Sequence, residues 1–320
     1  MFFLALALVF DFLNGFHDSA NIVAVVITSR AMGPRQALLW TALGEFLGPL
    51  LFGVAVAHTI GAELLAPEAM SLETALAALL AAIAWNLFTW WLGLPSSSSH
   101  ALIGGLVGAG VASWGWRAVQ WAGLRKVLLA LLISPPAGFA AGYLLTRLTL
   151  WLAQAASPRI NTFFRVGQIA TSFALALSHG ANDAQKTMGL MTLALLSRGY
   201  LEHFEVPQWV ILTAAGAIAL GTSVGGWSII RTLGGRIFRV RPMHGFLAQL
   251  GGGVVIATAA WLGGPVSTTH VMSSAILGTG AAERWRQVRW GVVRDMLWAW
   301  FLTLPACAGL AMGLYMLLQR

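Results

Sequence analysis

The residues most able to do chemistry in this 320-residue chain are two aspartates within apolar sequence. Asp18 lies in NGFHDSAN and Asp183 in SHGANDAQK, each among amide and imidazole side chains. Carboxylate and amide oxygens bind hard cations, and a carboxylate inside a membrane can also carry a proton. We therefore predict cation binding or proton coupling there, with Na⁺ as a candidate ion at Asp18 and Asp183. The remaining candidates for this role are Asn14, His17, Glu45, Gln185 and Lys186.

Two structural questions stay open around these aspartates. Asp183 and Lys186 are three residues apart, so they could simply form an ion pair on one helix face. Asn14–Gly15 and His179–Gly180 precede the aspartates, and we expect the helices to be interrupted there, with carbonyl oxygens freed for ligation.

Two hydroxyl-rich motifs form the second chemical feature, GLPSSSSH from residue 93 and GGPVSTTH from residue 263. Pro95 and Pro265 suit the first turn of a helix, where proline loses no hydrogen bond. Free backbone N–H groups at such a helix start, together with the side-chain hydroxyls, would bind an oxyanion. The alternative is that the hydroxyls only cap helices or join them. The predicted substrate-binding hydroxyls are those of Ser96, Ser97, Ser98, Ser99, Ser267, Thr268 and Thr269.

The histidines that follow these motifs, His100 and His270, could donate to the anion, relay protons or cap carbonyl groups. The pattern SSSSH also allows a serine hydrolase that uses Ser97 or Ser99 with a histidine, because nucleophile and base must lie within hydrogen-bond reach. The second copy reads STTH, and two opposed sites have no use in a hydrolase. We therefore predict that the chain is not an enzyme.

Both features occur twice in the same order. The hydroxyl motifs are related by 170 positions, which also pairs Pro135 with Pro305, and the two aspartates are related by 165 positions. With five spans in each half, the second copy enters the membrane from the opposite side. We predict two inverted-topology repeats, residues 1–155 and 160–320, which is an architecture of many secondary transporters.

The elements that must position these residues are apolar helices. Hydrophobic residues make up 58% of the chain and charged residues 9%, against roughly 25% charged in a typical soluble domain. The fold class predicted is an all-α membrane protein with about ten spans, discontinuous helices and re-entrant hairpins. The predicted spans are residues 2–29, 37–60, 72–92, 97–113, 127–152, 164–197, 208–230, 243–262, 268–282 and 295–318.

Loop charges predict the orientation in an inner (plasma) membrane. One set of loops carries twelve Lys and Arg residues and the other set carries four. The positive-inside rule then places both termini outside. The same rule explains the net charge of +8, so no nucleic-acid partner is expected. Residues 1–10 have no basic start before Asp11, which argues against a cleaved signal peptide.

At these motifs the sequence resembles the inorganic phosphate transporter (PiT) family, in particular its bacterial low-affinity members. The stretches NGFHDSAN, GLPSSSSHALIGGLVG, SHGANDAQKTMG and GGPVSTTH carry the resemblance in both halves. It implies a membrane carrier, expected to be a homodimer, that moves inorganic phosphate with H⁺ or Na⁺ and needs no other cofactor. By the same resemblance Asn21 and Asn182 join Asp18 and Asp183 in phosphate and cation binding, and Ser97, Ser98, Thr268 and Thr269 contact phosphate.

Two positions depart from the pattern of many family members, because His17 and Lys186 stand where those members have asparagine. A fixed positive charge at Lys186 could replace one bound cation, so the sodium stoichiometry of the family cannot be carried over to this chain. The resemblance to bacterial members implies H⁺ rather than Na⁺ as the coupling ion, and we favour H⁺ on that ground. A sulfate carrier on the same scaffold remains the alternative. Sulfate cannot donate a hydrogen bond at neutral pH, whereas phosphate can, and an acceptor at Asp18 or Asp183 would favour phosphate.

Overall fold

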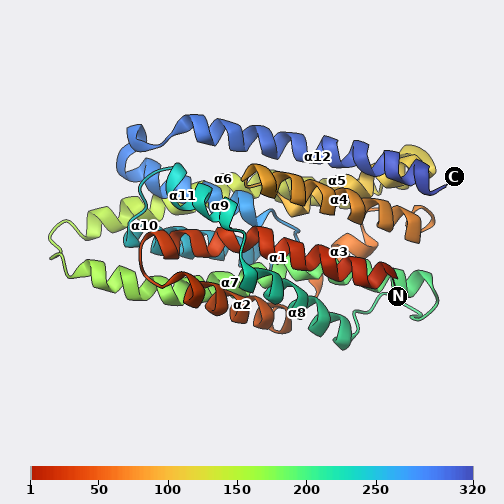
Figure 1. The fold of residues 1–320 in the computed structure, drawn as a ribbon, viewed down its shortest axis with the longest axis horizontal. Coiled ribbons are helices and arrows are strands. Elements are labelled where there is room, and N and C mark those ends of the chain that lie inside the picture. The colour runs from red at the N-terminus through yellow and green to blue at the C-terminus, as the bar shows by residue number, and fades with distance from the viewer. Residues whose placement is uncertain (1, 320) are drawn as a thin grey trace.

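The computed structural model describes residues 2–319, which are helical throughout apart from short connections and contain no β-strand. Figure 1 shows the helices running along the long axis of the molecule, with both termini at the same end. The α-helices of the first half are α1 (Phe2–Thr28), α2 (Pro34–Leu51), α3 (Ala55–Ala62), α4 (Leu72–Leu92), α5 (Ser98–Trp114) and α6 (Trp121–Leu152). Those of the second half are α7 (Ile160–Ser197), α8 (Gln208–Val224), α9 (Trp227–Arg231), α10 (Pro242–Trp261), α11 (Thr268–Arg284) and α12 (Trp290–Leu318).

Five of the described helices are long and apolar enough to cross a membrane, and seven are if each bent pair counts as one span. The bent pairs are α2 with α3, at 76°, and α8 with α9, at 58°. The sequence predicted one continuous span for each pair, at 37–60 and 208–230. The chain breaks after Leu51 and again at Gly225, whose positive φ of 77° ends the helix.

The two hydroxyl motifs lie at the tips of helical hairpins, as the sequence predicted. The first hairpin is α4 and α5, in the half of the molecule nearer the termini, and the second is α10 and α11, in the opposite half (Figure 1). Gly93 and Gly263 begin the two tips with φ of 66° and 69°, a left-handed conformation that favours glycine. The two hairpins therefore approach each other from opposite ends of the molecule.

The prediction that Pro95 and Pro265 begin these helices is wrong. Helix α5 begins at Ser98 and α11 at Thr268, three residues after each proline. The reason is that Ser97 and Ser267 cap the helices, accepting hydrogen bonds from the backbone N–H groups of His100 and His270 at 3.0 and 3.2 Å. The prolines lie in the non-helical tips.

The predicted interruptions at Asn14–Gly15 and His179–Gly180 are also wrong, because α1 and α7 are continuous through both points. The glycines serve close helix packing instead. A side chain at Gly15 would collide with the backbone of Ile218, and one at Gly180 would collide with the backbone of Glu45. Small residues at these crossings let the membrane helices approach.

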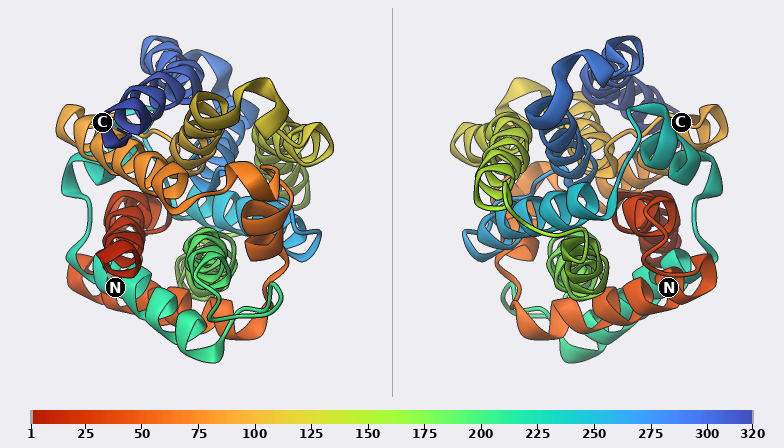
Figure 2. Two further views of the ribbon diagram at one scale, coloured as in Figure 1. Left: turned by 90° about the vertical axis from the view of Figure 1, so that its right-hand side faces the viewer. Right: turned by 90° about the vertical axis from the view of Figure 1, so that its left-hand side faces the viewer.

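Packing between the halves is reciprocal. Helix α1 packs on α8 while α7 packs on α2, and α5 packs on α12 while α11 packs on α6. Figure 2, which looks along the helices, shows α1 and α7 inside this assembly with α2 and α8 beyond them. Helices α1 and α7, which carry Asp18 and Asp183, therefore each pack against a helix from the opposite half.

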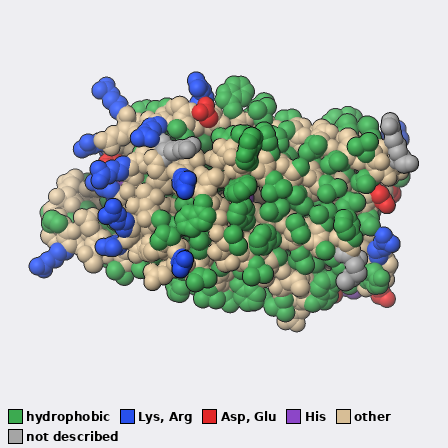
Figure 3. Space-filling view, in the orientation of Figure 1, with side chains coloured by type: hydrophobic (Ala, Val, Ile, Leu, Met, Phe, Trp, Pro, Cys, Tyr) green, Lys and Arg blue, Asp and Glu red, His purple; other side chains and the backbone are tan. Residues whose placement is uncertain are grey.

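The surface has the distribution expected of a membrane protein. Large hydrophobic side chains such as Trp91, Leu132 and Phe301 are exposed on the flanks of the molecule. On the face shown in Figure 3, most Lys and Arg side chains gather at the end away from the termini. Within the described chain, an apolar flank of this kind needs a lipid or protein covering.

Candidate functional site

A polar stripe on one face of α1 meets a second stripe on α7 inside the protein. Asn14, Asp18 and Asn21 lie at helical spacing on α1, and His179, Asp183 and Lys186 do so on α7. All six side chains are at most 1% exposed. Because each stripe follows the three-and-four residue repeat of a helix, continuous helices are sufficient to bring these groups together.

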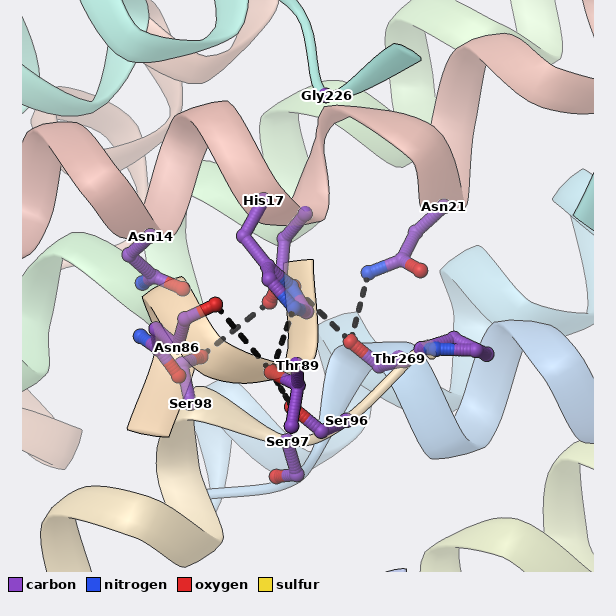
Figure 4. Close-up of polar contacts among 12 residues, drawn as sticks. Asn14, His17, Asn21, Asn86, Thr89, Ser96, Ser97, Ser98, Gly226 and Thr269 are labelled. Atoms are coloured by element: carbon purple, nitrogen blue, oxygen red, sulfur yellow. Dashed lines mark hydrogen bonds and ion pairs between the residues drawn. The ribbon is translucent and has the colours of Figure 1, made fainter. Parts of the chain in front are cut away.

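Asp18 accepts hydrogen bonds from both hairpin tips. Thr269 Oγ1 donates to Asp18 Oδ1 at 3.1 Å, and Ser98 Oγ donates to Asp18 Oδ2 at 3.3 Å. His17 Nδ1 lies 2.8 Å from Asp18 Oδ1. Asn21 extends the network, because its amide donates to Thr269 Oγ1 at 3.0 Å (Figure 4).

Asp183 is joined to Asp18 through one hydroxyl group. Thr268 Oγ1 lies 3.1 Å from Asp183 Oδ2 and 3.4 Å from Asp18 Oδ2, so its hydrogen can serve either carboxylate. Asn14 Nδ2 approaches Asp183 Oδ2 at 3.5 Å. The duplicated aspartates, 165 positions apart in sequence, thus belong to one cluster, as predicted.

The Lys186 ammonium group neutralises Asp183. Its Nζ lies 2.5 Å from Asp183 Oδ1 and 3.4 Å from the carbonyl oxygen of Val266 in the second tip. Lys186 is completely buried. The ion pair between Lys186 and Asp183, which the sequence allowed but did not decide, therefore forms. Lys186 also contacts the tip of the second hairpin.

Glu45 joins the cluster through His179. His179 Nδ1 lies 2.9 Å from Glu45 Oε1, and its Nε2 lies 3.6 Å from Asp183 Oδ2. Thr222 on α8 donates to the other Glu45 oxygen. Asp18, His179 and Asp183 offer three ligand atoms within 4.8 Å of one another, a spacing that would suit a small cation.

The other predicted hydroxyl groups hold the hairpin tips together in this structure. Ser96 Oγ lies 2.7 Å from Thr89 Oγ1 on α4, and Ser99 donates to the carbonyl oxygen of Val266 at 2.9 Å. Ser97 and Ser267 are helix caps, as described above. Of the seven predicted hydroxyls, only Ser98, Thr268 and Thr269 contact the aspartates, and a substrate role for the seven stays a prediction.

Two further candidates on α7 bind backbone rather than the aspartates. Asn182 Nδ2 donates to the carbonyl oxygen of Gly264 at 3.2 Å, which fixes the second tip. Gln185 Oε1 accepts from the backbone N–H groups of Val56 and Ala57 at 2.8 and 3.3 Å, and so caps the start of α3. Both side chains are buried beside the cluster.

Sequence reasoning missed five buried polar residues around the site. They are Asp11 on α1, Asn86 and Thr89 on α4, His179 on α7, and Thr222 on α8. Asp11 was detectable, because it lies seven residues before Asp18 on the same helix face. Asn86 and Thr89 are isolated polar residues in an apolar span, and their sequence gives no sign that they face Ser98 and Ser96 (Figure 4).

The two histidines after the hydroxyl motifs meet where the hairpins touch. The ring centroids of His100 and His270 are 4.5 Å apart, and His270 stacks on Trp300 at 4.0 Å. His100 Nδ1 lies 2.8 Å from Ser97 Oγ, the pair that could have indicated a hydrolase. Because Ser97 Oγ already accepts the His100 backbone N–H, this contact belongs to a helix cap.

Each tip is also anchored by a threonine from the opposite half. Thr232 donates to the carbonyl oxygen of Gly93 at 2.9 Å, and Thr59 donates to that of Gly263 at 2.8 Å. Thr59 in turn accepts from Lys126, which pairs with Glu63 at the surface at 3.1 Å. Partial burial acts to raise the pKa of Glu63, but the hydrogen bonds and the charges of Lys126 and His58 together outweigh it and lower that pKa.

The fold and the site together define a multi-pass membrane transporter, with paired hairpins and a buried polar centre between them. Residues 14–311 match the model of the phosphate transporter family. The chain belongs to this family, and it is a phosphate transporter.

Individual relatives and a solved structure agree with this assignment. The chain is 47% identical to a probable low-affinity inorganic phosphate transporter of Rhizobium meliloti (strain 1021), covering 95% of this chain and 92% of the relative. It is 43% identical to one of Bacillus subtilis (strain 168), covering 98% and 95%. It also matches a solved structure described as the sodium-dependent phosphate transporter, with a TM-score of 0.90 and 25% identity over 100% of this chain and 99% of that chain.

These comparisons confirm the family and the all-helical fold class predicted from the motifs. They also confirm that the chain is not an enzyme, because the family and the relatives are transporters.

Proposed function

We propose that this transporter is a symporter that moves inorganic phosphate together with a cation by alternating access. The observation that supports it best is the Thr268 hydroxyl shared by Asp18 and Asp183. One hairpin tip thereby contacts both duplicated carboxylates, so a change at the anion site would be felt at the cation site. Coupled transport requires such a linkage between the two binding events.

Phosphate is the oxyanion that this chemistry fits best. The hydroxyls of Ser98, Thr268 and Thr269 can donate to phosphate oxygens, and the carboxylates of Asp18 and Asp183 can accept from a phosphate O–H. Sulfate has no O–H at neutral pH, so it could not donate a hydrogen bond to those carboxylates. A sulfate carrier is the second candidate function, because the hydroxyl donors and the fold would serve either oxyanion.

H⁺ is favoured over Na⁺ as the coupling ion. The Lys186 ammonium already lies between a carboxylate and a carbonyl oxygen, a ligand set that suits a hard cation. The remaining candidate group of Asp18, His179 and Asp183 includes an imidazole, whereas Na⁺ and similar hard ions prefer oxygen ligands. The solved structural relative is described as sodium-dependent, so the coupling ion is the point an experiment must decide.

Alternating access follows from the proposed inverted repeats, residues 1–155 and 160–320. The reciprocal packing of α1 on α8 and α7 on α2 supports this relation, as do the hairpins in opposite halves of the molecule. Each hairpin would then close the site from its own end. We further propose an inner-membrane location with both termini outside, supported by the Lys and Arg side chains gathered at the other end. The homodimer implied by the family resemblance remains a proposal.

Uptake by proteoliposomes tests these statements. We expect labelled phosphate to accumulate when a proton gradient is imposed, with little response to a sodium gradient, and excess sulfate to compete weakly. Asp18→Asn should lower uptake severely, because the hydroxyls of both tips lose their charged acceptor. Accumulation driven only by sodium would contradict proton coupling, and equal competition by sulfate would contradict phosphate selectivity.

A further inference from the structure

Asp11 is a buried carboxyl group that the proposed symport does not yet use. Asp11 lies on a membrane-spanning helix, and its side chain is 0% exposed. The Thr187 hydroxyl on α7 lies beside it, but neither Asp11 oxygen is hydrogen-bonded in this structure. Burying a charged carboxylate without hydrogen-bond donors destabilises the folded protein, and such a group normally becomes neutral by taking a proton.

The other three buried carboxyls differ from Asp11 in their partners. Asp18 accepts from Ser98 and Thr269, and Asp183 is paired with Lys186. Glu45 lies against His179 and Thr222. Asp11 has no ion-pair partner among the described residues.

The charge balance of the interior also requires bound protons or cations. Among the side chains that the structure describes, the buried acidic ones are Asp11, Asp18, Glu45 and Asp183. The basic groups paired with them are the Lys186 ammonium and the imidazoles of His17 and His179, and none of these pairs includes Asp11. Even with both imidazoles charged, three positive charges do not neutralise four carboxylates, and an excess of buried negative charge would be strongly destabilising. The carboxyl with the poorest set of donors is the one expected to be protonated first.

The position of Asp11 suits a proton on its way to or from the site. It lies seven residues before Asp18 on the same face of α1, which is about 10 Å toward the end where the termini lie. The charged groups that act on it are Asp183 and Lys186 from α7 and Glu45 from α2. The equivalent position in the second copy, 165 residues later, is Ala176, so the second half has no such carboxyl.

We propose that Asp11 is a proton-binding site of the transport cycle, separate from the group formed by Asp18 and Asp183. This inference rests on the proposed proton coupling. Asp11 is a neutral carboxylic acid in this conformation. It takes its proton from a hydronium ion on the side of the termini, leaving water, and gives the proton up to water after the site opens to the other side.

The test compares Asp11→Asn, Asp11→Glu and wild type in proteoliposomes. Per coupled proton, each unit of imposed pH difference is worth about tenfold in phosphate accumulation. Asp11→Asn should lose this response while keeping phosphate-for-phosphate exchange close to the wild-type rate, because exchange needs no net proton movement. Asp11→Glu keeps a carboxyl group and should keep the response. Asp295→Asn, at an exposed carboxyl paired with Arg294, is the matched control and should behave as wild type.

Each result decides between the inference and the function beneath it. Wild-type uptake that ignores a proton gradient would overturn proton coupling itself. A proton-driven wild type with an equally proton-driven Asp11→Asn would overturn only the role of Asp11. Loss of phosphate exchange in an Asp11→Asn variant that inserts normally would place Asp11 in the phosphate site instead. If the wild type responds to a sodium gradient and Asp11→Asn does not, Asp11 would be a sodium ligand. Failure of Asp11→Asn to insert, when Asp11→Glu inserts, would contradict a neutral Asp11.

Discussion

The two hairpin tips share a sequence motif but use it differently. In the second tip, Thr268 contacts both aspartates and Thr269 contacts Asp18. In the first tip, Ser98 alone reaches an aspartate, while Ser96 bonds to Thr89 and Ser99 donates to the second tip. The two tips therefore share a motif, but in this structure most of the contacts with the aspartates come from the second tip.

The helices facing the tips show the same asymmetry in charge. Lys186 of α7 corresponds to Asn21 of α1, and Asp11 of α1 corresponds to Ala176 of α7, each pair 165 positions apart. A repeated architecture can therefore hold two unlike charged sites, one basic and one acidic.

The largest effect should come from Lys186→Met, which removes the positive charge beside Asp183. Breaking a buried ion pair by deleting one partner costs about 3–5 kcal/mol, because the other charge is left without compensation. We expect a lower melting temperature in detergent and loss of phosphate uptake. Asn21→Met, at the equivalent position of α1, should destabilise the protein much less.

A double variant, Lys186→Gln with Asp183→Asn, separates stability from function. It removes both charges, so it should regain stability without regaining uptake. A double variant as unstable as Lys186→Met would show that the ion pair is not what holds this region together.

The next effect compares the two tips directly, through Thr268→Val and Ser98→Ala. Leaving a buried carboxylate without one of its donors costs about 1–3 kcal/mol, and about 1.4 kcal/mol corresponds to a factor of ten in affinity. Thr268→Val keeps the side-chain shape and should weaken phosphate uptake by roughly tenfold or more. Ser98→Ala should have the smaller effect, since Asp18 keeps Thr269. If both variants showed an equal rise in the Michaelis constant and an equal fall in the transport rate, the two tips would act symmetrically.

The smallest effect should show the symmetry of the scaffold. A side chain at Gly108 would collide with the backbone of Ala308, and one at Gly278 with the backbone of Phe139. Overpacking of this kind costs about 1–3 kcal/mol, and we expect Gly108→Ala and Gly278→Ala to destabilise the protein by similar amounts in thermal unfolding. Gly313→Ala on α12 has open space around it and serves as the control. A large difference between the first two would mean that the halves are packed differently.

Much of this arrangement was predictable from the sequence. Long apolar runs fixed the helices, and the repeated motifs indicated that Asp18, Asp183 and the hydroxyls would meet. Helical spacing was enough to place His179, Asp183 and Lys186 on one face of α7.

The remainder depended on contacts between distant segments. The start of α5 was set by the Ser97 cap rather than by Pro95, and Gly15 was a packing residue rather than a helix break. Both alternatives use the same residue types, so only the neighbouring helix distinguishes them. Asn86 and Thr89 gave no signal because their partners lie on another element.

The threonines that bind the two tips have a mechanical consequence. Thr59 and Thr232 lie in the bent segments of opposite halves, each near a sharp change of direction in the chain. A hairpin that retracts must therefore either release its threonine or drag the bent segment of the other half with it. In the second case the proposed movements of the two hairpins would be mechanically coupled, and the opening of one hairpin would force the other to close.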